Sequence, residues 1–432
     1  MMEISKIESS LLRETIYHTT VGAGLRVFVM PRKGYSKKHA SFAAHHGSLD
    51  THFIHPSSER EVEVPEGIAH FLEHEMFERE DGSVFDEFSR LGASANAFTD
   101  YTSTTYVFST TDNFEESLAT LLSLVQEPHF TDKNVEKEKG IIEQELRMYQ
   151  DMPPVKAETN LLKGLYHRNP VRVDIGGTPE SIREITPQML YTCHEAFYHP
   201  ANMALFVTGD VDVCRVVELV SSTQEKWDRG PSSSPRRIYP DEPEAVHQRT
   251  TEEKMSVSLP IVLTGWKDRC TGQSGRKLLA RQAAGGMLLG ALFGRSSAAF
   301  ERLYEQRLIG DRFAASFEAE PVYSHASVGG ESPEPSRLID EITETMEDAR
   351  SRGVDRKTVQ RLKNKVVGEF VALFSSPEQV ARLFNAVLFK GASIFDYYEV
   401  LRHLAPEDLE RLLDEVFVPE HCAVSVVSPR ER

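Results

Sequence analysis

The sequence contains no long hydrophobic run and only a few cysteines. No stretch of about eighteen apolar residues occurs in the 432-residue chain, and residues 1–8 lack the apolar core of a secretory signal. The cysteines lie far apart, without the close pairing of a zinc or redox motif, at Cys193, Cys214, Cys270 and Cys422. These absences predict a cytoplasmic protein with reduced thiols and no membrane partner.

Positive charge is also scarce. Lysine and arginine total 49 against 66 acidic residues, which gives a formal net charge of −17. This balance argues against nucleic acid as a partner, because proteins hold phosphate backbones with cationic patches. A hydrophobic content of 40% and a charged content of 27% are typical of a globular protein, and the length predicts at least two domains.

The sequence does contain a compact group of potential metal ligands. Residues 67–74 read Gly-Ile-Ala-His-Phe-Leu-Glu-His, so His70 and His74 are four residues apart. On a helix this spacing places both imidazoles on one face about one turn apart, where they can bind one metal ion. Glu73 lies between them in sequence, and its carboxylate can reach a metal-bound water. The pattern is H-x-x-E-H, the inverted form of a zinc-protease motif.

A second helix, predicted over residues 131–149, supplies two carboxylates. Glu138 and Glu145 are seven residues apart and share one face, with Ile142 between them. Acidic side chains on an otherwise apolar stripe indicate a binding role. Zinc bound by two histidines and one carboxylate, with a fourth position open, is a known catalytic arrangement. We therefore predict Glu145 as the third ligand and Glu138 as the group that orients a histidine.

These two segments together resemble the insulysin–pitrilysin family of zinc metallopeptidases. Residues 92–99 (Gly-Ala-Ser-Ala-Asn-Ala-Phe-Thr), followed by residues 105–108, are similar to the active-site edge strand of that family. The resemblance extends from about residue 24 to residue 428 and is closest to small cytosolic bacterial members. It implies one zinc ion per chain and a peptide substrate.

The resemblance also implies roles for individual residues. It assigns Glu73 as the general base on a zinc-bound water, and Asn96 and Ala97 as contacts of the substrate backbone. Active members use an arginine and a tyrosine from their second half near the substrate carbonyl, and Arg312 and Tyr323 are the nearest candidates here.

The sequence repeats one pattern in its two halves. Residues 185–207 match residues 404–426, and Pro187, Pro200 and Ala204 are each followed 219 positions later by the same residue type. The repeat predicts a catalytic N-terminal half (1–228), a linker (229–250) and a non-catalytic C-terminal half (251–432). The second copy of the motif helix is expected near residues 282–293, without histidine or glutamate.

The resemblance implies an α+β fold in which each half is an antiparallel sheet covered by helices, the two halves forming a clamshell. Within the first half, the spacing of Asp112 and Glu115 predicts a capping box at the start of a helix.

Three functions are compatible with these patterns. The first is a zinc endopeptidase that hydrolyses peptides or unfolded segments within a closed cavity. The second is a non-catalytic or partner-dependent subunit of a heterodimeric processing peptidase, which would pair with a paralogue; a homodimer is the other possible assembly. The third is a metal-dependent hydrolase of a non-peptide substrate, which the predicted edge strand disfavours.

Overall fold

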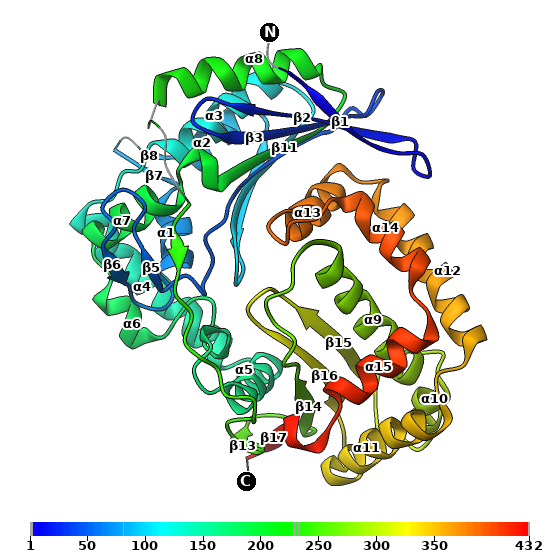
Figure 1. Ribbon diagram of the computed structural model, residues 1–432. Coiled ribbons are helices and arrows are strands. Elements are labelled where there is room, and N and C mark those ends of the chain that lie inside the picture. Colours follow the sequence, from blue (N-terminus) through cyan, green and yellow to red (C-terminus); the bar gives the residue numbers. More distant parts are fainter. Residues whose placement is uncertain (1–2, 81, 228–229, 231–233, 431–432) are drawn as a thin grey trace. The chain divides into compact units, whose positions relative to one another are not determined.

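The structure is a computed structural model that describes residues 3–80, 82–227, 230 and 234–430. It confirms the predicted α+β class, with two compact units that each contain a sheet and helices (Figure 1). The first unit comprises Met1–Leu146, Asp174–Ile238 and Leu373–Phe389, and the second comprises Arg147–Val173, Tyr239–Ala372 and Lys390–Arg432.

The first unit is built on a seven-stranded sheet in the order β1-β2-β3-β11-β4-β10-β9. All neighbours in it are antiparallel except β3 and β11. The strands are β1 (Ser5–Ser9), β2 (Glu14–Val21), β3 (Leu25–Pro31), β4 (Lys38–Ala44), β9 (Ser94–Thr99), β10 (Thr104–Thr110) and β11 (Met203–Gly209). Two small sheets accompany it, formed by β5 (His52–Ile54), β6 (Glu61–Glu63) and β12 (Arg236–Arg237), and by β7 (Glu78–Arg79) and β8 (Gly82–Ser83).

Helices cover this sheet on both faces. Leu205 and Val207 of β11 join the main apolar core, whereas Phe206 between them stacks on Phe384 of α13, so α13 lies on the opposite face. The helices of this unit are α1 (Ile68–Glu75), α2 (Val84–Arg90), α3 (Phe114–Gln126), α4 (Asp132–Gln150, ending at the unit boundary), α6 (Pro179–Glu184), α7 (Pro187–Phe197), α8 (Val213–Gln224) and α13 (Pro377–Leu388).

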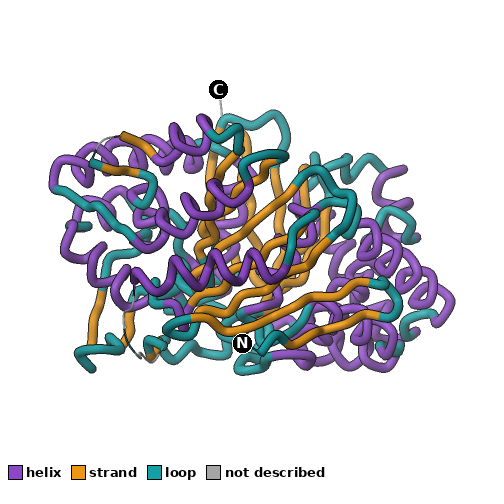
Figure 2. Tube along the Cα trace, turned by 90° about the horizontal axis from the view of Figure 1, so that it is seen from above, coloured by secondary structure: helices purple, strands orange, loops and turns teal. Residues whose placement is uncertain are grey.

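The second unit has a five-stranded sheet in the order β13-β17-β14-β16-β15. Its strands are β13 (Thr250–Met255), β14 (Ile261–Lys267), β15 (Ala314–Ala319), β16 (Ser324–Glu331) and β17 (Cys422–Pro429). Its helices are α5 (Pro153–Leu165), α9 (Gly275–Phe293), α10 (Ala298–Glu305), α11 (Pro335–Arg352), α12 (Arg356–Leu373), α14 (Ile394–His403) and α15 (Pro406–Val416). Figure 2 shows the strands in orange with helices in purple around them.

The two sheets share their strand order and directions. The series β3-β11-β4-β10-β9 and the series β13-β17-β14-β16-β15 each begin with a parallel pair and continue with antiparallel pairs. In each unit a helix contacts the last strand of the series, α1 on β9 and α9 on β15. This shared topology supports the predicted repeat, and α9 contains neither histidine nor glutamate.

Each unit also contains one helix from the sequence of the other. Helix α13 contacts β4 and β11 of the first sheet, while α5 contacts β14 and β17 of the second. Phe384 of α13 is 4% exposed and lies against Phe28 and Phe206, with ring centres 4.8 and 4.3 Å away. The units are therefore discontinuous in sequence.

The predicted capping box at Asp112 and Glu115 is wrong. Helix α3 follows Asn113, which has a φ of 49° and makes no side-chain cap hydrogen bond. Asp112 instead closes a tight turn with Thr110, whose hydroxyl accepts from the Asp112 N–H and donates to its carbonyl. The turn takes the Asp112 N–H, which would donate to the Glu115 side chain in a capping box. Helix α4 is capped by Thr131, whose hydroxyl accepts from the Asn134 N–H at 3.2 Å.

Two expectations drawn from absences can be compared with the structure. In the described part of the chain, no helix combines the length and apolar character required to span a bilayer. The cysteines at 193, 214, 270 and 422 are free thiols.

We expect Phe384→Ala to destabilise the first unit by about 3–5 kcal/mol, because it removes the aromatic ring that packs against Phe28 and Phe206 on two neighbouring strands. The measurement is urea unfolding. Gln379→Ala, at an exposed position of the same helix, serves as the control and should change the free energy by less than about 0.5 kcal/mol. Equal effects of the two substitutions would show that α13 does not stabilise this sheet.

Candidate metal centre and sheet edge

At the N-terminus of helix α1, the backbone is in close contact with the backbone of the loop at residues 174–177. Gly67 has a φ of 85°, and a Cβ at this position would come within 2.2 Å of the Gly176 carbonyl oxygen. Gly177 has a φ of 82°, and its Cβ would lie 2.4 Å from the Glu66 carbonyl oxygen. Only glycine tolerates both the left-handed backbone and this approach. This loop was not among the features predicted from sequence, although the adjacent glycines at 176 and 177 are a visible signal.

The apolar face of α1 is buried against the sheet and neighbouring helices. Ile68, Ala69, Phe71 and Leu72 are at most 2% exposed. Because His70 and His74 are four residues apart, they share a helix face, and this face is the less buried side of α1.

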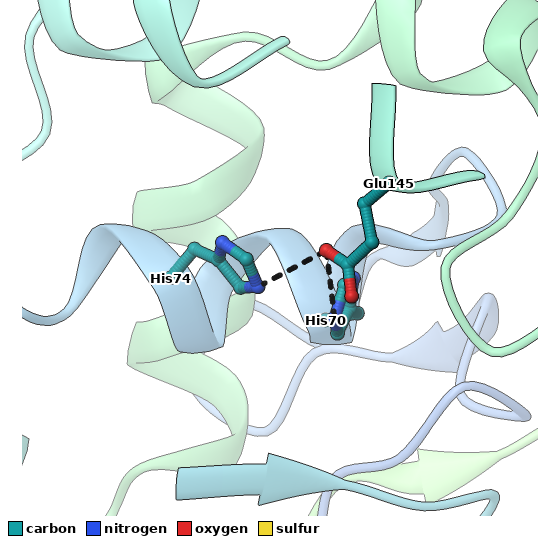
Figure 3. A group of neighbouring side chains, drawn as sticks. All are labelled: His70, His74 and Glu145. Atoms are coloured by element: carbon teal, nitrogen blue, oxygen red, sulfur yellow. Dashed lines mark ion pairs between the residues drawn. The ribbon is translucent and has the colours of Figure 1, made fainter. Parts of the chain in front are cut away.

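The structure brings the three predicted ligands together. His70 Nε2 is 4.0 Å and His74 Nε2 is 3.8 Å from the same oxygen of Glu145, Oε2 (Figure 3). All three potential ligand atoms lie within 4.8 Å of one another. Two imidazole nitrogens and one carboxylate oxygen on converging side chains are a donor set that zinc prefers. The residues therefore fit a zinc ion.

Glu138 lies seven residues before Glu145 on α4 and fixes the orientation of His74. Its Oε1 is 2.8 Å from His74 Nδ1, which leaves Nε2 directed toward Glu145. A carboxylate on the far nitrogen of a metal-binding histidine holds the ring in this way and increases its basicity.

The two histidines titrate differently. Burial, together with the neighbouring His74, lowers the pKa of His70 to about 3, so this imidazole is neutral at pH 7. Burial also opposes the charged form of His74, but the hydrogen bond and charge of Glu138 outweigh it and raise the pKa of His74. In the absence of metal, His74 is therefore the histidine that holds a proton more readily.

Glu73 lies between the metal ligands and the sheet. Its side chain is 8% exposed, and Thr99 Oγ1 of β9 donates to its Oε2 at 2.6 Å. Burial raises the pKa of Glu73, while the Thr99 hydrogen bond opposes the shift. A carboxylate with a raised pKa, held beside a metal site, is suited to accept and return a proton.

Strand β9, which carries Thr99, is the edge of the sheet. Within the described chain it pairs with β10 alone. The Asp100 N–H donates to the Ser103 carbonyl, so Asp100 forms a hydrogen-bonded pair across the turn between β9 and β10. Hydrogen-bonded residues alternate along an antiparallel pair, so Ala95, Ala97 and Thr99 direct their main-chain N–H and C=O groups away from β10, to the free edge. The Asn96 side chain accepts from the Ala97 N–H at 2.9 Å. The predicted contact residues Asn96 and Ala97 thus both lie at a free edge.

The remaining predicted residues, Arg312 and Tyr323, are not brought together. Arg312 is 75% exposed and pairs with Glu331, whereas Tyr323 is 3% exposed and stacks on His325. They lie near opposite ends of the β15–β16 hairpin, about 25 Å apart at the rise of an extended strand.

Comparison with known proteins identifies the family. Residues 53–178 match the insulinase family (peptidase family M16), and residues 184–366 match the peptidase M16 inactive domain. The uncharacterized zinc protease YmfH of Bacillus subtilis (strain 168) is 41% identical over 427 residues, which cover 99% of this chain and 100% of YmfH. The chain therefore belongs to the insulinase family, peptidase family M16, and the resemblance seen in the sequence is confirmed.

Solved structures agree with this assignment. An M16-like peptidase from Alicyclobacillus acidocaldarius is 34% identical and has a TM-score of 0.92, covering 98% of this chain and 100% of that one. Pitrilysin shares the fold at a TM-score of 0.78 and 14% identity, and the match covers 100% of this chain and 47% of pitrilysin. Relatives named as zinc proteases support a protease-like hydrolase.

Glu75, the last residue of α1, is a buried acid that the sequence analysis did not single out. It is fully buried, and among the described residues neither of its carboxylate oxygens has a hydrogen-bond partner. Burial and the charges of Glu138 and Glu78 raise its pKa to about 8. The sequence does contain a signal for Glu75, because it is an acidic residue on the apolar face of a helix predicted to be buried.

We expect Glu75→Met to raise the free energy of unfolding by about 1–3 kcal/mol at pH 8. The unfolded chain releases the Glu75 proton near pH 4.5 and the folded chain near pH 8, so the wild type loses stability as pH rises through this window. The gain should shrink toward pH 4. Urea unfolding at both pH values measures it, with exposed Glu80→Met as the control. A loss of stability at pH 8 would contradict the assignment of Glu75 as unpaired.

We expect Glu138→Gln to weaken zinc binding by about 10- to 100-fold at pH 8, because His74 loses the carboxylate that orients it. In the wild type, zinc must displace a proton from His74 as pH falls, and this competition begins above the ordinary histidine pKa of 6.5. In the variant, the competition between zinc and the His74 proton should begin at lower pH, because the charge of Glu138 no longer raises the pKa of His74. Chelator competition across pH tests both effects, and unchanged affinity in the variant would refute the orienting role.

Proposed function

We propose that the chain is a zinc endopeptidase that hydrolyses peptides or unfolded segments. The observation that carries this proposal is the convergence of His70 Nε2, His74 Nε2 and Glu145 Oε2 beside Glu73. One zinc ion per chain, held by these three atoms, would supply a Lewis acid that acidifies water and polarises the scissile carbonyl.

The residues of the chain supply the proton transfer. Glu73 accepts the proton of the attacking water and returns it to the leaving amine. Thr99 holds the carboxylate through its 2.6 Å hydrogen bond, and burial keeps the proton affinity of Glu73 above that of an ordinary glutamate. Glu138 keeps the His74 ring turned toward the ligand group.

The edge strand β9 favours a peptide as the substrate. An extended peptide can pair with the outward main-chain groups of Ala95 and Ala97, and such pairing recognises backbone rather than a particular sequence. The Asn96 side chain must leave the Ala97 N–H for this to happen, which makes Asn96 and Ala97 proposed substrate contacts. Because Thr99 lies on the same strand, the bound backbone passes next to Glu73.

We expect Glu73→Gln to retain about one zinc per chain and to lose peptide hydrolysis by a factor of at least about 100. The amide preserves the side chain's size but accepts no proton. Zinc content and cleavage of a mixed quenched-peptide library are the measurements, with Glu80→Gln, at an exposed site, as the control. Full activity of Glu73→Gln would exclude this residue as the base, and absence of zinc from the wild type would exclude the metal site.

One observation favours a second candidate, a partner-dependent subunit of a heterodimeric processing peptidase. Arg312 is exposed and Tyr323 is buried far from it, and this separation does not support the pair as the arginine and tyrosine that the family resemblance implies near the substrate carbonyl. A wild type that binds zinc but cleaves no peptide, and gains cleavage when a paralogous subunit is added, would support this candidate. Cleavage by the purified chain alone would exclude it.

The cytoplasmic location and the dimeric assembly remain predictions. The fold itself occurs elsewhere, since the periplasmic protease PqqL from Escherichia coli has a TM-score of 0.73 at 16% identity.

A further inference from the structure

A cavity of about 630 Å³ lies over β9 and β10, on the sheet face opposite to α1. Its lining comes from β9, β10, α13 and residues near the start of β4, all of them in the first unit. The two faces can be told apart along β9. Ala95 and Ala97 pack against the main core and Thr99 binds Glu73, whereas Ser94, Asn96 and Phe98 line the cavity.

A peptide that pairs with β9 has the same alternation. Every second side chain of the peptide points toward Glu73 and the metal ligands, and the side chains between them point toward the cavity. The cavity therefore receives a substrate side chain that lies next to the one at the metal side.

The floor of the cavity is apolar. Phe98 is 37% exposed, and the half-buried Val107 adds aliphatic surface. This surface can cover the methylene groups of a side chain whose end carries a polar group.

The acid in the cavity is already engaged. Glu378 of α13 forms an ion pair with Lys37 and accepts hydrogen bonds from Ser376 Oγ at 2.9 Å and Ser109 Oγ at 3.0 Å. These partners outweigh the effect of burial and lower the pKa of Glu378 to about 2. Glu378 stays ionised and has little remaining capacity for a ligand cation.

Arg382, one turn further along α13, lines the same cavity and is exposed. Among the described residues, no acidic side chain forms an ion pair with its guanidinium, because Glu378 is held by Lys37 instead. The cavity thus combines an apolar floor with an unpaired cation, and a guanidinium binds carboxylates with two parallel hydrogen bonds.

The geometry points to a specificity subsite that selects an acidic substrate side chain, with its carboxylate on Arg382 and its methylene groups on Phe98. A lysine or arginine side chain would meet Arg382 and Lys37 and is disfavoured there. This inference rests on the proposed function, since it is β9 pairing that delivers the side chain to the cavity.

Two series of quenched peptides test the subsite. In one a single glutamate moves along an alanine–serine sequence, and in the other a lysine takes its place. The wild type should show a glutamate-over-lysine ratio of kcat/KM of about ten-fold at a single position relative to the cleaved bond. Arg382→Gln should reduce this ratio by about five-fold and Arg382→Glu should reverse it. Arg402→Glu, with the same charge change at an exposed site of α14, should leave it unchanged.

The outcomes separate this inference from the proposed function. Cleavage of both series at equal rates, or an unchanged ratio in Arg382→Glu, overturns the subsite and leaves the peptidase intact. If neither series is cleaved, fluorescence anisotropy with the same peptides still decides. Tighter binding of one glutamate peptide that is lost in Arg382→Glu supports the subsite while the peptidase proposal fails. No preference, or no binding, overturns the subsite.

Discussion

The contact between two backbones at the N-terminus of α1 determines where the candidate site can form. Helix α1 is short, and its ligand side chains emerge within two turns of Gly67. A side chain at residue 67 or 177 would separate the helix from the Asp174–Gly177 loop by more than an ångström. Such a shift would move the His70 and His74 nitrogens relative to α4, which is fixed independently by its own apolar face. The site thus depends on close packing of main chain as much as on its ligands.

Without a bound cation, the candidate metal site has an excess of carboxylate groups over cationic groups. Glu73, Glu138 and Glu145 lie around the two imidazoles. The charge of Glu145 adds to burial in raising the pKa of Glu73, and the charge of Glu138 adds to burial in raising the pKa of Glu75. A divalent cation lowers the repulsion between these carboxylates directly, because it is attracted to every carboxylate at short range. The same acids that make the metal-free helix costly to fold therefore favour a bound metal ion.

The sequence predicted those features that local spacing determines. A four-residue separation puts His70 and His74 on one face of any helix, and a seven-residue separation does the same for Glu138 and Glu145. Spacing within a helix does not reveal its neighbour, and the meeting of the two helices was predicted instead from chemistry, because a carboxylate completes the donor set that two histidines begin. A local signal failed where a second local interaction competes with it, as at Asp112, whose turn with Thr110 replaced the expected cap. Residues such as Arg312 and Tyr323 lie beside strands whose pairing separates them, and nothing in their immediate sequence indicates this.

The exchange of α5 and α13 between the two units has a consequence for biosynthesis. The sheet that carries the candidate site is made of segments completed by residue 209, yet the helix that covers its second face is encoded at residues 377–388. During translation this sheet face, with Phe28 and Phe206, stays uncovered until most of the polypeptide has been synthesised. The second sheet receives α5 early, from residues made before any of its own strands. Maturation of the proposed peptidase site is thereby tied to the last quarter of the chain, and a truncated product would carry all of the ligands on a sheet with one face uncovered.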